Sequence, residues 1–148
     1  MKLELTRSQA FMALGIAVIS ADDKCTSQEI EMLLNLFRKL KLIACNSQEE
    51  CEYNWANLFD ETFEKLKTAF PDRQMSMTQK ELNILIPIVE QAVGQANYQS
   101  LFDFAVAIAL SDGLDTREKV ILDRLQKDLN IGLKGEYQNL SQQLDLVH

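Results

Sequence analysis

Residues 101–118 read LFDFAVAIALSDGLDTRE, and they combine the features from which the fold can be predicted. Its first ten residues are apolar nearly throughout, which predicts a helix that is buried on every side. An acidic turn follows, and Asp115 and Glu118 have the spacing of a capping box at the start of a second helix. The stretch therefore predicts a helical hairpin whose first helix lies inside the core.

The same order of features occurs near the beginning of the chain, where residues 11–29 read FMALGIAVISADDKCTSQE. After a one-residue deletion in the turn, Glu29 aligns with Glu118. The repeat copies extend over about 8–42 and 98–131. One hairpin cannot cover a helix that is apolar all round, so we expect the two copies to share one core.

Helix starts recur along the whole chain as Ser, Thr or Asp followed three residues later by Glu or Gln. The pairs are Thr6/Gln9, Thr26/Glu29, Ser47/Glu50, Thr78/Glu81 and Asp115/Glu118. Helical patterns predict helices at about 7–20, 27–41, 48–70, 79–93, 98–110, 116–129 and 136–146. Pro87 is expected to kink or split the helix in which it falls. We therefore expect an all-α, compact single-domain bundle of about seven helices over residues 1–148.

Length and charge limit the function classes. The chain has 148 residues, which suit one domain, and only 5 Gly and 2 Pro, which disfavours an all-β fold. Its 22 acidic residues exceed its 15 Lys and Arg, for a net charge of -7. Such a chain repels nucleic acid and anionic lipid, so we expect no nucleic-acid partner and favour cations or basic protein patches.

The cysteines are three: Cys25, Cys45 and Cys51. An odd number without a Cys-x-x-Cys spacing predicts free thiols in a reducing compartment and no disulfide. Zinc is not expected, because the one histidine is His148.

An apolar run at residues 10–21 follows Lys2 and Arg7, as in a secretory signal. A similar run at 101–110, where no signal can lie, favours a buried helix instead. Neither run is long enough to span a bilayer. We expect a cytoplasmic monomer without a transmembrane segment.

The acidic turns are the candidate site. Asp22 and Asp112 each follow the C-terminal end of an apolar helix, where a carboxylate is unfavourable by about 0.3–1 kcal/mol. A hard cation such as calcium, magnesium or manganese would offset this cost, because carboxylate and carbonyl oxygens are its preferred ligands. The candidate metal ligands are Asp22, Asp23, Glu29, Asp112, Asp115 and Glu118.

A purely structural interpretation of these turns stays open. Asp115, Glu29 and Glu118 are members of capping boxes, and Asp-Gly is an ordinary turn sequence. Lys24 can neutralise Asp22 or Asp23 in the first turn, so that no metal ion is needed there. Neither turn matches the calcium loop of an EF-hand, and no nucleophile–base, P-loop or dinucleotide pattern occurs, so we expect no enzyme.

The two hairpins resemble the TerB-like family of tellurite-resistance proteins. The resemblance is carried by the buried helix, the turn Ser111-Asp112-Gly113-Leu114-Asp115 and Glu118, with a weaker copy from Ala21-Asp22-Asp23 to Glu29. It implies a bundle of about seven helices, no catalytic activity, an acidic surface implicated in divalent-cation binding, and a role in tellurite or chemical-stress responses. The alternative is a metal-independent protein–protein interaction module that docks a partner through an acidic face.

Overall fold

The computed structural model describes residues 3–21, 26–71, 77–111 and 116–129. This part of the chain forms six α-helices and one 3-10 turn, and it contains no strand. The elements are α1 (Arg7–Ile19), α2 (Ser27–Lys39), α3 (Gln48–Ala69), α4 (Gln79–Val93), η1 (Gln95–Asn97), α5 (Tyr98–Leu110) and α6 (Thr116–Leu129). The all-α prediction is confirmed. The seventh helix, predicted at about 136–146, lies outside the described residues.

Side-chain caps start most of these helices where the sequence predicted them. Thr6, Thr26 and Thr78 each accept a hydrogen bond from the backbone N–H three residues later, and the residue there reaches back to complete a capping box. Ser47 Oγ accepts a hydrogen bond from the Glu50 backbone N–H at 3.1 Å. The Glu50 carboxylate does not complete a capping box with the Ser47 backbone N–H, and it accepts a hydrogen bond from Asn46 Nδ2 instead.

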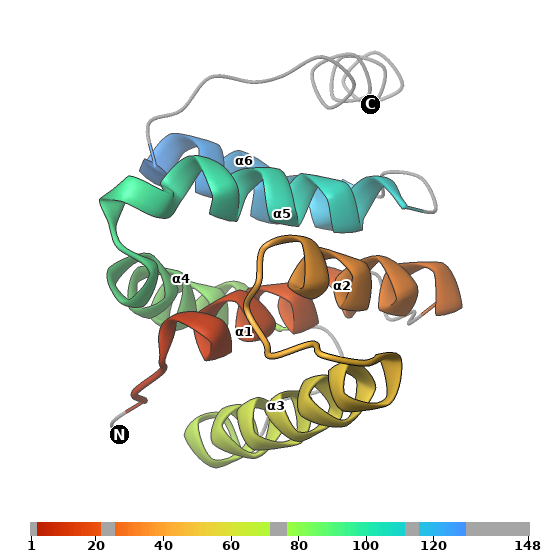
Figure 1. Ribbon diagram of the computed structural model, residues 1–148. Coiled ribbons are helices and arrows are strands. Elements are labelled where there is room, and N and C mark those ends of the chain that lie inside the picture. The colour runs from red at the N-terminus through yellow and green to blue at the C-terminus, as the bar shows by residue number, and fades with distance from the viewer. Residues whose placement is uncertain (1–2, 22–25, 72–76, 112–115, 130–148) are drawn as a thin grey trace.

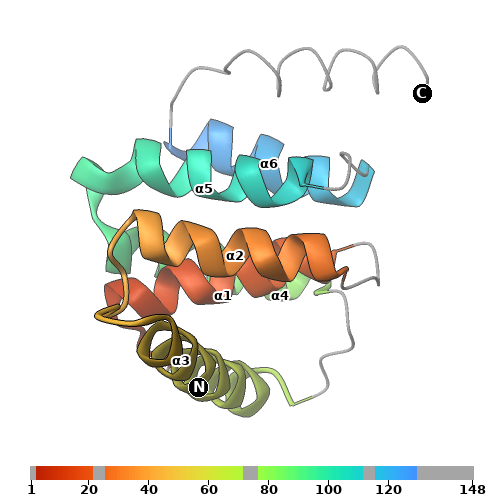
Figure 2. The same cartoon turned by 45° about the vertical axis from the view of Figure 1, so that its right-hand side comes forward.

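Helix α1 occupies the centre of the bundle. Every residue from Gln9 to Ile19 is buried, because α3, α4 and α5 all pack against this helix. Figures 1 and 2 show α5 and α6 as an upper layer, α1, α2 and α4 as a middle layer and α3 beneath. A helix without a polar face is thus covered on every side, as its composition requires.

The two apolar helices α1 and α5 touch directly. The Phe11 and Phe104 rings meet edge to face with centroids 5.1 Å apart, and the Phe37 ring of α2 stacks on Phe104 at 5.8 Å. Gly15 brings the backbone of α1 so close to α2 that a Cβ there would lie 2.7 Å from Leu33 Cδ1. The prediction that the two hairpins share one core is therefore confirmed.

Pro87 lies inside α4, and the helix continues through it from Gln79 to Val93. The predicted split at Pro87 is therefore wrong. The Pro87 side chain is exposed, so its ring displaces no core residue. No helix in the described ranges is both long and apolar enough to cross a membrane.

Candidate functional site

The helix ends that flank the two acidic turns lie at one end of the bundle. The last turn of α1 and the first turn of α2 are on the right in Figure 1, as are the end of α5 and the start of α6. Figure 2 shows the same arrangement from a second direction. Four of the six predicted ligands, Asp22, Asp23, Asp112 and Asp115, lie outside the described residues.

Glu29 is the described ligand candidate of the first copy. Its side chain is 0% exposed in the first turn of α2. Glu29 Oε1 accepts hydrogen bonds from the Thr26 backbone N–H at 3.3 Å and from Thr26 Oγ1 at 3.1 Å. The capping bonds and the positive end of the helix dipole both favour a carboxylate at this position. Glu29 therefore caps the helix through one of its carboxylate oxygens, Oε1, as the capping interpretation predicts.

Glu118 occupies the equivalent position of the second copy, in the first turn of α6, and is 1% exposed. Its expected capping partner, Asp115, lies outside the described residues. Glutamate is almost never fully buried in proteins unless it is paired. Glu29 and Glu118 are thus both completely buried, at matching positions of the repeat.

The described residues alone hold no metal centre. Within the ranges that the structure covers, no three His, Cys, Asp or Glu side chains come together as a metal-binding group. Glu29 and Glu118 are thus not joined by a third acidic residue from those ranges. The aspartates of the two turns, which the sequence predicts as further ligands, lie outside those ranges.

The cysteines differ from their prediction. Cys45 and Cys51 form a disulfide, with the sulfur atoms 2.16 Å apart and the Cα atoms 4.4 Å apart. The expectation of three free thiols is therefore wrong for these two residues, and Cys25 lies outside the described residues. The pairing arises because the chain reverses between α2 and α3, which brings Cys45 back beside the first turns of α3.

That reversal begins at Lys41. The Lys41 backbone N–H donates to the Arg38 carbonyl at 3.2 Å and the Leu42 N–H to the Phe37 carbonyl at 3.0 Å, which is a Schellman motif. Lys41 has a φ of 56°, a left-handed conformation that glycine usually provides. Ser8 Oγ then donates to the Leu42 carbonyl at 2.8 Å and holds the returning segment against α1.

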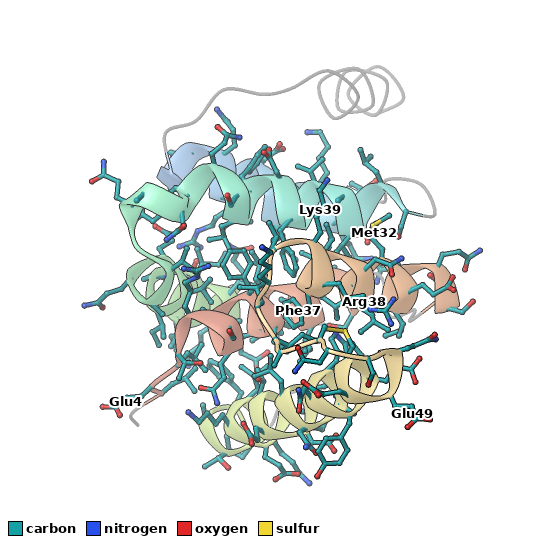
Figure 3. The ribbon with its side chains drawn as sticks, viewed as in Figure 1. Glu4, Met32, Phe37, Arg38, Lys39 and Glu49 are labelled. Carbon is teal, nitrogen blue, oxygen red and sulfur yellow. A yellow bond between two sulfur atoms is a disulfide. The ribbon has the colours of Figure 1, made fainter. Side chains whose placement is uncertain are left out.

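A cationic side chain contacts the disulfide. Arg38, in the last turn of α2, donates a hydrogen bond from Nε to Cys51 Sγ at 3.1 Å. Figure 3 shows Arg38 beside the yellow sulfur–sulfur bond, between α2 and α3. Cys51 is 1% exposed, whereas Cys45 is exposed. The two sulfur atoms of one bond therefore have different access to solvent and different electrostatic surroundings.

Two other surface features stand out. On α3, the rings of Trp55, Phe59 and Phe63 stack in a row, with centroid distances of 5.5 and 6.1 Å. Phe63 is 36% exposed and Tyr53, on the same helix, is 69% exposed. We call the row of Trp55, Phe59 and Phe63 the aromatic face of α3.

The second feature is the carboxyl group of Glu90, on α4. Burial and, to a smaller extent, the carboxylate of Asp128 on α6 together raise the pKa of Glu90 to about 7, although Arg124 opposes the shift. The Glu90 carboxyl group therefore retains its proton to higher pH than an ordinary glutamate does.

Comparisons with protein-family models, with curated proteins and with solved structures found no match to this chain.

Sequence reasoning missed Arg38, Cys45 and Cys51. Cys45 and Cys51 lie on either side of Ser47, the N-cap of α3. Because the chain turns where it enters a helix, this position could have indicated that the two cysteines lie close together.

Proposed function

We propose that this chain is a non-enzymatic helical domain of the TerB-like kind that binds one divalent cation between its two acidic turns. The observation that carries the proposal is the complete burial of Glu29 and Glu118 at matching positions of the repeat. Their helices start at the same end of the bundle, where the ends of α1 and α5 also lie (Figure 1).

The physical argument is one of charge. Asp22 and Asp112 follow the C-terminal ends of α1 and α5, which carry partial negative charge. The turns add Asp23 and Asp115, so like charges accumulate at one end of an already acidic protein. A cation with oxygen ligands would neutralise this charge, and calcium, magnesium and manganese all prefer such ligands. The resemblance to TerB-like proteins adds tellurite or chemical-stress response as the biological setting.

Thermal unfolding tests the proposal. Wild-type protein is melted with a chelator and with millimolar calcium, magnesium or manganese. A bound ion stabilises the folded state by about 2.7 kcal/mol when its free concentration is a hundredfold above its dissociation constant. The double substitution Asp22→Asn/Asp112→Asn should abolish this gain without destabilising the metal-free protein.

Two controls separate the proposal from capping. Asp60→Asn/Glu61→Gln removes two charges from the exposed surface of α3 and should keep the full metal response. If capping is the only role of the turns, Glu29→Ala and Glu118→Ala each lose up to about 1 kcal/mol with or without metal. The cation proposal fails if none of the three ions shifts the melting temperature of the wild type.

A metal-independent interaction module is the second candidate, and the aromatic face of α3 favours it. Exposed aromatic rings are enriched where proteins meet. Exposed acidic residues flank the rings on the same helix: Asp60, Glu61 and Glu64. A basic, apolar helix has the complementary chemistry.

The fluorescence of Trp55, the one tryptophan of the chain, reports on this surface. A synthetic amphipathic peptide of Lys and Leu should change the emission of wild-type protein in a chelator. The change should weaken in Phe63→Ser, whereas Ile84→Ser, which removes an exposed apolar side chain from α4, should preserve it. An emission spectrum that the peptide leaves unchanged would exclude this docking surface.

A further inference from the structure

We propose that Cys45–Cys51 is a thiol–disulfide exchange site whose substrate is a low-molecular-weight monothiol. In this site Cys45 is the sulfur that the external thiolate attacks, and Cys51 is the sulfur that leaves. The proposal is independent of cation binding, because it uses the segment between α2 and α3 and neither acidic turn.

Access determines which sulfur is attacked. Exchange requires a thiolate to approach a disulfide sulfur, so the rate depends on the exposure of that sulfur. Cys45 is exposed in the segment before α3, whereas Cys51 is 1% exposed. An external thiolate therefore reaches Cys45 and not Cys51.

The surroundings of Cys51 suit a leaving thiolate. Arg38 Nε already donates a hydrogen bond to Cys51 Sγ at 3.1 Å, and this bond becomes charge-assisted when the sulfur is negative. Cys51 is also the fourth residue of α3, close to the positive end of that helix. Arg38 and the helix N-terminus both favour thiolate over thiol, against the opposing charges of Glu49, Glu50 and Glu52 beside Cys51. A more stable leaving thiolate departs faster.

The reaction takes two steps. An external thiolate forms a bond to Cys45 Sγ, the Cys45–Cys51 bond breaks, and its electron pair remains on Cys51 Sγ. A second external thiolate then attacks the outer sulfur of the mixed disulfide and releases Cys45 as a thiolate, which takes up a proton. The protein disulfide gains two electrons, and two external thiols are oxidised to one external disulfide.

The reduced pair remains positioned to close again. Asn54 Nδ2 donates to the Ala44 carbonyl at 2.9 Å, and Ser8 Oγ donates to the Leu42 carbonyl, so the segment that carries Cys45 stays attached to α3 and α1. Neither bond depends on the disulfide. Because the thiols stay near each other, the reverse reaction with an external disulfide restores the bond, and the site is reversible.

The first measurement is a redox equilibrium. Full-length Cys25→Ser protein is equilibrated anaerobically with mixtures of reduced and oxidised glutathione, trapped by alkylation and analysed by mass spectrometry. Arg38→Gln should shift the equilibrium towards the disulfide by about tenfold, or about 30 mV for a two-electron couple. Lys39→Gln is the matched control, because it removes the neighbouring positive charge in the same turn of α2 and should change the equilibrium less than twofold.

The second measurement follows thiolate absorbance of the reduced protein from about pH 5 to about pH 9. Arg38→Gln should move the transition to higher pH, Lys39→Gln should leave it in place, and Arg38→Lys should fall between them. A merely structural role of Arg38 does not predict this ordering. Circular dichroism of each variant confirms that it is folded.

Single-cysteine variants test the direction of attack. In Cys51→Ser, Cys45 should form a mixed disulfide with oxidised glutathione at least tenfold faster than Cys51 does in Cys45→Ser, because access controls exchange. Equal rates, or a faster Cys51, would overturn the assignment of attacked and leaving sulfur. The exchange site itself is excluded if the wild-type pair stays reduced in oxidised glutathione, or if Arg38→Gln behaves as Lys39→Gln does.

Discussion

Gly15 offers the sharpest test of the packing between the two repeats. A Cβ at this position would lie 2.7 Å from Leu33 Cδ1, where ordinary contact begins at 3.4 Å, and 3.5 Å from Phe104 Cζ. Leu33 is itself fully buried, so its methyl group has little room to move. Gly15→Ala should therefore force a local displacement of α1 or of Leu33.

Two effects of opposite sign set the magnitude. Alanine is favoured over glycine in a helix interior by about 0.8–1.0 kcal/mol. Overpacking of a close-packed core costs about 1–3 kcal/mol, and the conflict with Leu33 falls in this range. We expect Gly15→Ala to lower the free energy of unfolding by about 1 kcal/mol, and Gly15→Leu by about 3 kcal/mol.

Urea unfolding, followed by circular dichroism, measures these changes, and a double-mutant cycle with Leu33→Ala isolates the contact. Leu33→Ala alone costs about 2–5 kcal/mol, but it removes the obstructing methyl group. In that background Gly15→Ala should be neutral or stabilising by up to about 1 kcal/mol. If Gly15→Ala stabilises the wild-type background by the full helix-propensity gain, the close approach of α1 and α2 is refuted.

Three further substitutions test local features. Lys41→Gly should stabilise the protein by up to about 1 kcal/mol in urea unfolding, because glycine adopts the left-handed conformation without the cost that lysine bears; a destabilised variant would contradict the Schellman motif. Thr6→Ala should cost about 1 kcal/mol through loss of the capping box, and unchanged unfolding would contradict it. The raised pKa of Glu90 favours the protonated folded state, so its contribution to stability is present below about pH 4.5 and lost as the pH rises through about 7. Glu90→Gln should be more stable than wild type at about pH 8 and lose this advantage below about pH 4.5, whereas an advantage independent of pH would contradict the raised pKa of Glu90.

Local signals in the sequence predicted the helices well. The bounds of α5, Tyr98–Leu110, match the predicted range, and α3 ends one residue before its predicted end, because caps, Pro71 and helical periodicity act within a few residues. The close contact of α1 and α5 also followed from composition, since neither helix has a face to offer water.

Features that depend on chain reversal were not predictable in this way. The turn that precedes Cys45 uses a left-handed residue at Lys41, and lysine gives no local sign of that conformation. The hydrogen bond from Arg38 to Cys51 joins α2 to α3, and no local pattern predicts it. For Glu29, the capping role was visible in the sequence, but its complete burial arises from packing between helices that are distant in the chain.

Direct binding of manganese to the full chain tests the proposed function most simply. Equilibrium dialysis, or the loss of the free-ion signal in electron paramagnetic resonance, gives the number of ions bound per chain. We predict saturable binding of one Mn²⁺ to wild type and to Asp60→Asn/Glu61→Gln, competition by calcium or magnesium, and no binding to Asp22→Asn/Asp112→Asn. Weak, unsaturable binding that is the same in all three proteins would contradict a cation site at the acidic turns.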